Sequence, residues 1–197
     1  MKASVFIRFA VAAVASLLVA GSLQAGPVLD VTSPGDLIVG TSTNYPVNES
    51  PPNAIDNDPN TKYLNFDKLN SGFTVTPLFG ASYLTGIALT TANDATERDP
   101  MTVTITGSND GLLWLPVITD LATPLSTDRY TESEFSFMSE SAGTFLMYRV
   151  IFPTVRNPGS ANSMQIGEVR LMGVPEPATL ALMGLGTLGV WLGRRKR

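Results

Sequence analysis

The side chains best suited to binding a ligand lie in one short acidic loop. Asp56, Asp58 and Thr61 occur close together, among the turn-forming residues Asn57 and Pro59. Calcium takes about six to eight oxygen ligands from carboxylates, hydroxyls and backbone carbonyls, and a tight acidic loop can supply several of them. Asp and Asn before Pro also form turns without any metal. The loop by itself therefore leaves two interpretations open, a calcium site and a solvated turn.

A second acidic group could support catalysis. Glu132 and Glu134 are two residues apart, and Glu140 follows nearby. A glycosidase needs only two carboxyl groups about 5–10 Å apart. At strand spacing Glu132 and Glu134 point to the same face, which is equally typical of an exposed acidic sheet edge. We predict the edge and no catalytic residues, and a carboxylate-dependent glycan hydrolase is the enzymatic alternative.

Aromatic side chains offer a further way to bind a ligand, because their faces pack against the apolar C–H faces of sugar rings. Tyr45 and Tyr63 fall in predicted loops and are the ligand-binding candidates. Trp114 follows a turn inside a predicted strand, and Tyr148 lies in an apolar run, so both are predicted to be core residues. Arg149 is open between a ligand contact and an ion-pair partner. Tyr83 and Tyr130 are two further candidates for sugar stacking.

Composition excludes several kinds of site. The 197 residues contain no Cys and no His, which removes disulfides, Cys/His zinc sites, thiolate nucleophiles and histidine-based triads. Residues 26–174 contain all seventeen acidic residues except Glu176, but only seven of the thirteen basic ones. The resulting net charge near −9 argues against a nucleic-acid partner.

The central part of the chain must position these residues, and its pattern is that of β-strands. Met101–Thr106 alternates apolar and polar residues, Gly107–Gly111 is rich in turn residues, and Leu112–Ile118 resumes as the partner strand. Other expected strands are Leu37–Val39, Phe73–Thr76, Leu84–Thr90, Phe135–Phe137, Phe145–Phe152 and Ile166–Leu171. Short strands joined by Pro, Gly, Asn and Asp loops predict an all-β sandwich or jelly roll over residues 26–173.

The N-terminus reads as a secretory signal peptide over residues 1–25. Lys2 and Arg8 give a positive start, Phe9–Ala20 is an uncharged apolar run, and Ala25 is a small residue before the expected cleavage point. We therefore expect export and cleavage after Ala25.

The C-terminus reads as a membrane segment with a stop. Ala178–Gly193 is uncharged, and as a helix it would be roughly 24 Å long, somewhat shorter than the hydrocarbon core. It is followed by four cations that would stay in the cytoplasm, Arg194, Arg195, Lys196 and Arg197. Before it, Pro175 and Pro177 flank Glu176, and two prolines disfavour helix and sheet, so we expect an extended, accessible backbone there.

Residues 174–197 resemble the PEP-CTERM sorting signal, because they contain its three parts in order: Pro175-Glu176-Pro177, an apolar run and a basic end. That signal occurs in exported proteins of Gram-negative bacteria that make extracellular polysaccharide. The resemblance implies that an exosortase, an integral-membrane cysteine protease, recognises the tripeptide and removes the tail. The inner membrane would then hold the protein only transiently.

The middle of the chain is similar to a discoidin or coagulation-factor type C domain. The likeness rests on four segments in order: residues 53–63, 102–114, 148–152 and 165–169. It implies a galactose-binding-like jelly-roll sandwich and a structural calcium whose loop ligands Asp56, Asp58 and Thr61 are completed by Glu168. The chain lacks the terminal cysteine pair of the vertebrate members.

Together these features predict an exported, non-catalytic binding module, associated with the cell surface or exopolysaccharide and binding carbohydrate. Its expected partners are the secretion machinery, an exosortase, extracellular polysaccharide and, transiently, the inner membrane. The alternative from another class is a structural matrix protein without a small ligand.

Overall fold

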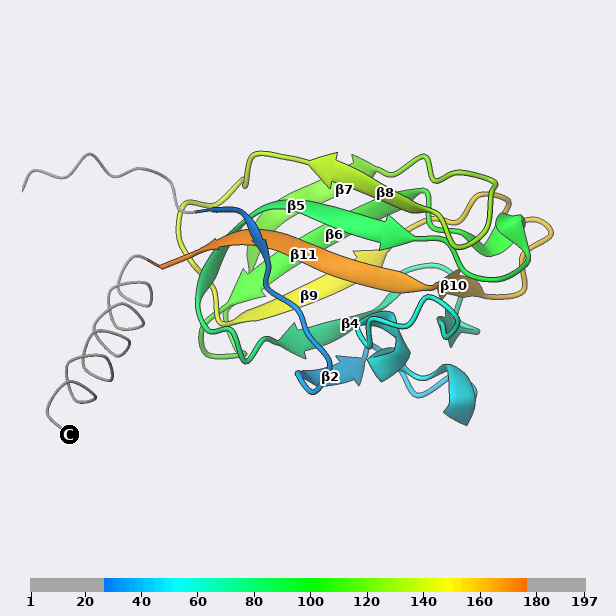
Figure 1. Ribbon diagram of the computed structural model, residues 1–197, viewed down its shortest axis with the longest axis horizontal. Helices are drawn as coiled ribbons and strands as arrows, with labels where there is room; N and C mark the ends of the chain where they lie inside the picture. The colour runs from blue at the N-terminus through cyan, green and yellow to red at the C-terminus, as the bar shows by residue number, and fades with distance from the viewer. Residues whose placement is uncertain (1–26, 177–197) are drawn as a thin grey trace, which may run out of the picture.

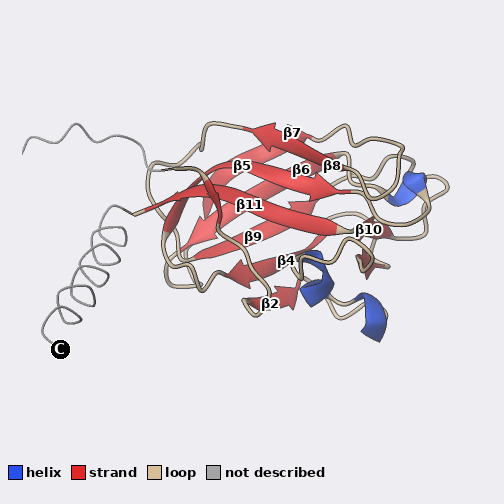
Figure 2. Ribbon diagram, in the orientation of Figure 1, coloured by secondary structure: helices blue, strands red, loops and turns tan. Residues whose placement is uncertain are grey.

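The computed structural model describes residues 27–176, which form two antiparallel β-sheets packed face to face (Figures 1 and 2). One sheet has the strand order β1 (Leu29–Asp30), β11 (Glu168–Pro175), β5 (Ser82–Thr90) and β8 (Glu132–Ser136). The other has the order β2 (Leu37–Gly40), β4 (Ser71–Thr76), β9 (Met147–Phe152), β6 (Thr102–Ser108) and β7 (Leu115–Ala122). The predicted all-β sandwich is confirmed.

Smaller elements close one end of the sandwich. A two-stranded ribbon pairs β3 (Tyr63–Asn65) with β10 (Met164–Ile166). Three short 3₁₀-helices lie in the loops: η1 (Val47–Glu49), η2 (Pro51–Ala54) and η3 (Thr96–Arg98). Within residues 27–176 no helix is long and apolar enough to cross a bilayer.

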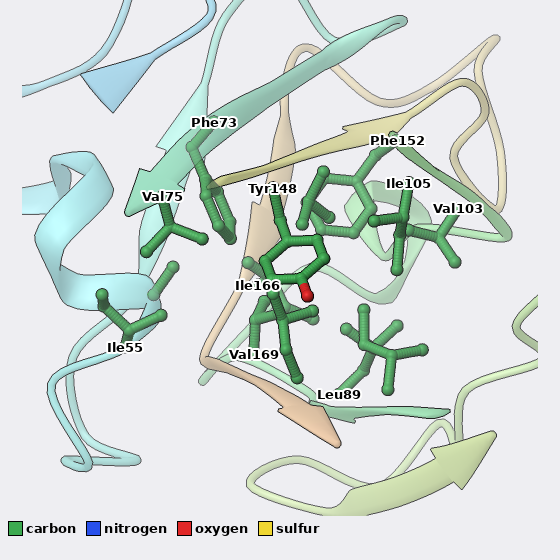
Figure 3. Close-up of a cluster of buried hydrophobic side chains, with 14 of the residues drawn as sticks. Ile55, Phe73, Val75, Leu89, Val103, Ile105, Tyr148, Phe152, Ile166 and Val169 are labelled. Carbon is green, nitrogen blue, oxygen red and sulfur yellow. The ribbon is translucent and has the colours of Figure 1, made fainter. Parts of the chain in front are cut away.

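The core lies between the two large sheets, and strand alternation explains which residues fill it. Phe73, Tyr148 and Phe152 on the five-stranded sheet are fully buried and face Leu89 and Val169 on the four-stranded sheet (Figure 3). Each such side chain contributes roughly 1.5–3 kcal/mol when it leaves water. The prediction that Tyr148 is a core residue is confirmed.

Strand β11 runs from one end of the domain to the other. It begins at Glu168 beside the acidic loop and runs through the middle of its sheet to Pro175, at the end where the chain leaves toward the C-terminus (Figure 1). The expectation that the prolines keep this segment out of the sheet is wrong for Pro175, which pairs with Ser82 and is buried. A proline is tolerated there because no neighbouring strand needs its N–H. The Ser82 backbone exchanges its bonds with Phe145, the next bond toward β5 comes from the Glu176 N–H, and β1 pairs with β11 only at Met172 and Gly173.

Several predicted segments fall outside the described residues. These are the signal peptide 1–25 with its cleavage at Ala25, and the C-terminal part of the sorting signal: Pro177, the apolar run 178–193 and the basic residues 194–197.

Candidate functional site

The acidic loop between η2 and β3 is closed by its own side chains. The Asp56 carboxylate accepts the Asp58 N–H at 2.9 Å and the Thr61 hydroxyl at 2.8 Å. The Thr61 N–H donates to the Asp58 carbonyl at 3.1 Å. Asn57 adopts a left-handed φ of 61°, which Asn tolerates better than most residues. The loop therefore presents a fixed group of oxygen atoms.

Tertiary packing brings Glu168 to this loop from 110 positions away. As the first residue of β11 it lies under the loop, where its Oε1 accepts the Asp58 N–H at 3.0 Å. Its side chain is almost completely buried, with 6% of the residue exposed. Among the described residues, its Oε2 has no hydrogen-bond partner. A buried carboxylate oxygen without a partner is energetically costly, so this atom points to a missing ligand.

The electrostatics of the loop favour a cation. Burial and, next, the adjacent Asp56 carboxylate together raise the pKa of Glu168 to about 8, although the backbone N–H groups of Asp58 and Asn57 lower it. Two neighbouring carboxylates cannot both ionise comfortably away from water. A divalent cation between Asp56 and Glu168 would remove both the repulsion and the unpaired oxygen.

Three of the four side chains expected to bind calcium lie together. Asp56, Thr61 and Glu168 converge on the loop, whereas the Asp58 carboxylate accepts from Asn60 at 2.9 and 2.8 Å. Those two bonds lower the pKa of Asp58. Within residues 27–176, no three acidic side chains form one group that could hold a metal. Carbonyl oxygens and water would therefore supply the remaining ligands.

A polar hollow of about 410 Å³ opens beside the acidic loop. Its volume lies within the range of small-molecule sites. Seven residues line it: Asn57, Pro59, Thr90, Tyr130, Glu132, Glu168 and Arg170.

The sheet register explains why these residues meet. Glu132 of β8, Thr90 of β5 and Glu168 of β11 are direct cross-strand partners, so they form one row on the same face. Arg170 lies two residues further along β11 and therefore on that face as well. Tyr130 precedes β8 with a left-handed φ of 57°, held by its N–H bond to the Thr91 carbonyl at 3.1 Å.

Arg170 is the central basic group of the hollow. Its Nη2 donates to Glu132 at 2.6 Å and lies 3.6 Å from Glu134. Its Nε is buried and has no hydrogen-bond partner in the part of the chain that the structure describes. Glu132 and Glu134 are exposed residues of the edge strand β8, as the interpretation of an acidic edge predicts.

The two aromatic candidates lie elsewhere. Tyr63 is a core residue of β3, not a loop residue; it is completely buried and its hydroxyl donates to the Gly72 carbonyl at 2.9 Å. Tyr45 is half-buried and packs edge-on against Tyr63, with ring centroids 6.1 Å apart. Neither lines the hollow, whose aromatic residue is Tyr130, 50% exposed.

The prediction that Trp114 is a core residue is wrong. Trp114 is half-buried, and the Arg149 guanidinium lies 4.1 Å from the centre of its ring. Its indole N–H donates to the Gly111 carbonyl at 3.1 Å. The Arg149 side chain, which the sequence left open between a ligand contact and an ion pair, thus forms a cation–π pair with Trp114.

Sequence reasoning did not find Arg170 or Thr90. Arg170 could have been found, because strand alternation places it on the same face as Glu168. Nothing in the sequence places Thr90 opposite Glu168, since that pairing depends on the register of β5 against β11.

Comparison with known proteins identifies the C-terminus and the fold. Residues 173–197 match the PEP-CTERM protein-sorting motif. No curated protein matches the chain. Solved structures with the same fold include CBM32-5 of the Clostridium perfringens protein CpGH89, in complex with GalNAc-β-1,3-galactose; it is 15% identical, with a TM-score of 0.55 over 73% of this chain and 99% of that one.

Two further structures have the same architecture. An F5/8 type C domain from Bacteroides fragilis is 12% identical, with a TM-score of 0.59 over 76% of this chain and 98% of that one. The module CBM62 of Clostridium thermocellum Xyl5A is 19% identical, with a TM-score of 0.52 over 76% and 98%. The chain thus consists of a galactose-binding-like β-sandwich followed by a PEP-CTERM protein-sorting motif.

Proposed function

We propose that this protein is an exported, non-catalytic carbohydrate-binding module whose sugar site is the hollow beside the acidic loop. The observation that carries the proposal is the combination of Tyr130, half-exposed at the rim, with the partly exposed Glu132–Arg170 ion pair. An aromatic face suits the C–H face of a sugar. Charged groups beside it suit the ring hydroxyls, which both donate and accept hydrogen bonds.

The polar atoms of the hollow favour a hydroxyl-rich ligand over an apolar one. The side chains of Arg170 and Glu132 are 31% and 40% exposed, so a ligand can reach both of them. A sugar hydroxyl would accept from the Arg170 guanidinium and donate to a Glu132 oxygen. An apolar ligand would cover both groups without satisfying either of them.

A structural calcium ion is the second part of the proposal. It would be held by Asp56, Thr61 and Glu168 and would supply fixed positive charge. Because Glu168 belongs both to the loop and to the wall of the hollow, the ion would also stiffen the sugar site.

Sorting is the third part of the proposal. The motif match supports export with a transient membrane anchor. We further propose that an exosortase acts at Pro175–Pro177, and that the product reaches the cell surface or exopolysaccharide of a Gram-negative bacterium. Mass spectrometry of the mature protein should find a C-terminus close to Pro177. A mature protein that still ends at Arg197 would contradict processing.

Glycan arrays and affinity gels containing polysaccharide test the binding function. Tyr130→Ala should weaken retention at least about tenfold, since an aromatic contact of this kind is a typical binding hot spot. Phe66→Ala is the matched control, because Phe66 is 47% exposed but does not line the hollow. An equal loss of retention in both variants would indicate that the sugar binds elsewhere on the protein. No retention on any polysaccharide, including the producer's own, would favour a structural matrix protein.

A further inference from the structure

The end of the domain where the chain leaves the fold is firmly tied to the sandwich. Pro175 pairs with Ser82, and the Glu176 N–H donates to the Ala81 carbonyl at 3.3 Å. The Glu176 carboxylate accepts the hydroxyl of Thr144. In the sequence the apolar run 178–193 begins only two residues after Glu176. Whatever surface this run enters must therefore lie against this end of the domain.

Hydrogen bonds join three loops at the same end. Ser82 and Phe145 exchange backbone bonds of 3.1 and 2.9 Å, which connects the first residue of β5, directly after the β4–β5 loop, to the β8–β9 loop. Asn109, in the β6–β7 turn, donates to the Thr144 carbonyl at 3.1 Å and accepts the Leu146 N–H at 2.9 Å. Figure 1 shows these three loops together beside the end of β11.

These loops carry four exposed leucines, which we call the leucine cap: Leu78, Leu112, Leu113 and Leu146. They are 79%, 87%, 65% and 42% exposed, respectively. Exposed apolar side chains gathered at one end of a domain are a candidate interaction surface. The β6–β7 turn is also fixed in shape, because the Asp110 carboxylate accepts the N–H groups of Leu112 and Leu113 at 2.8 and 2.9 Å.

Charge at this end does not attract a bilayer. The carboxylates of Asp110 and Glu176 accept hydrogen bonds within the fold, and those bonds lower the pKa of Asp110, so it stays anionic. The cap itself consists of uncharged side chains. Contact with a bilayer would therefore depend on the leucines and would strengthen with salt on anionic lipid, because salt screens the repulsion, whereas a contact made by basic residues would weaken.

We propose that the leucine cap docks on the lipid bilayer that the apolar run 178–193 enters. The inference rests on the proposed membrane anchor and goes beyond it: the domain is held upright on the membrane rather than tethered loosely. Strand β11 has 8 residues, so its two ends are roughly 25 Å apart. Docking at the Pro175 end would point the hollow at the Glu168 end away from the membrane, toward extracellular polysaccharide.

The test uses the full chain in vesicles of phosphatidylethanolamine and phosphatidylglycerol. The chain contains no cysteine, so Leu112→Cys can carry a single polarity-sensitive fluorophore. The matched control is Val47→Cys, because Val47 is 89% exposed in η1, which lies toward the other end of the sandwich (Figure 1). Lipids carrying a bromine quencher should quench the label at position 112 and leave the label at position 47 unchanged.

A second pair of variants tests the leucines themselves. With the label at position 112, Leu78→Ser/Leu113→Ser should lower the ratio of docked to undocked protein by about tenfold for each leucine that loses lipid contact. Phe66→Ser/Leu69→Ser should have no effect, although Phe66 and Leu69 are 47% and 40% exposed. These two residues lie between β3 and the first residue of β4, whereas Leu78 follows the last residue of β4.

Each remaining outcome has a defined meaning. If the chain sediments with vesicles but lipid quenches neither label, docking is refuted and the anchor stands. Quenching at position 47 instead would show that the other end docks. A label 112 that is shielded only at high protein density, without quenching by lipid, would show contact between copies. If the chain does not sediment with vesicles, the anchor and the docking both fail.

Discussion

Replacing Glu168 with Gln should make the calcium-free protein more stable at high pH and less sensitive to pH. Glu168 is 6% exposed, and its pKa is raised from 4.5 to about 8 by burial and by Asp56. That rise corresponds to about 4–5 kcal/mol against ionising this carboxyl in the folded state. The amide oxygen of Gln can still accept the Asp58 N–H, so the variant removes the charge while the hydrogen bond stays.

The sign of the effect follows from proton linkage. The folded protein binds the Glu168 proton more tightly than the unfolded chain does. The stability that this proton provides is therefore complete below pH 4.5 and is lost as the pH rises through about 8. Glu168→Gln does not titrate, so its free energy of unfolding should exceed that of the wild type by an amount that grows between these pH values.

Urea unfolding at pH 5, 7 and 9 in the presence of a chelator measures this difference. Saturating calcium should narrow the difference, because only the wild type retains the carboxylate ligand; at a calcium concentration of 100 times Kd, the wild type would gain about 2.7 kcal/mol. Asp56→Asn is the matched variant. Its free energy of unfolding should also fall as the pH rises, but by less than that of the wild type. Wild-type and Glu168→Gln free energies that differ by the same amount at all three pH values would refute the reasoning.

Three further predictions concern the scaffold, each measured by the same urea unfolding. Phe152→Ala should cost about 3–5 kcal/mol, because Phe152 is fully buried between the sheets; a loss below 1 kcal/mol would contradict the packing. Gly72→Ala should cost at least about 2 kcal/mol, since a Cβ there would overlap the Val150 carbonyl of β9; a neutral change would mean that the β4–β9 approach is looser. Arg129→Leu should cost about 3 kcal/mol, because Asp99, 1% exposed in its side chain, would lose its two-bond partner; adding Asp99→Asn should restore part of the loss, and no recovery would argue against the pair.

The position of the sorting motif shows how local rules and tertiary structure can differ. Two prolines around Glu176 disfavour a strand, yet Pro175 is the last paired residue of β11. The rule for proline concerns a ladder hydrogen bond, and at Pro175 neither neighbouring strand uses one, because Ser82 bonds to Phe145 and β1 pairs only with Met172 and Gly173. The same pairing places the end of β11 beside the loops that carry the leucine cap, a relation that no local pattern contains.

The sequence by itself determined the features that depend on local order. Alternation over residues 101–106 and the turn residues after it predicted the β6–β7 hairpin, and the order of motif, apolar run and cations predicted the sorting signal. Both can be read without a fold, because side-chain period and the linear order of residues do not depend on distant contacts. The acidic loop was found for the same reason.

Tertiary structure decided which distant residues meet. It placed Glu168 under the acidic loop, aligned Glu132 and Thr90 with it in one row, and buried Tyr63 in the core. These facts depend on strand register, and shifting a strand by one residue would reverse the face of every side chain in it. Because register is set by the packing of the whole core, the hollow and the orphaned carboxylate oxygen of Glu168 exist only in the folded chain.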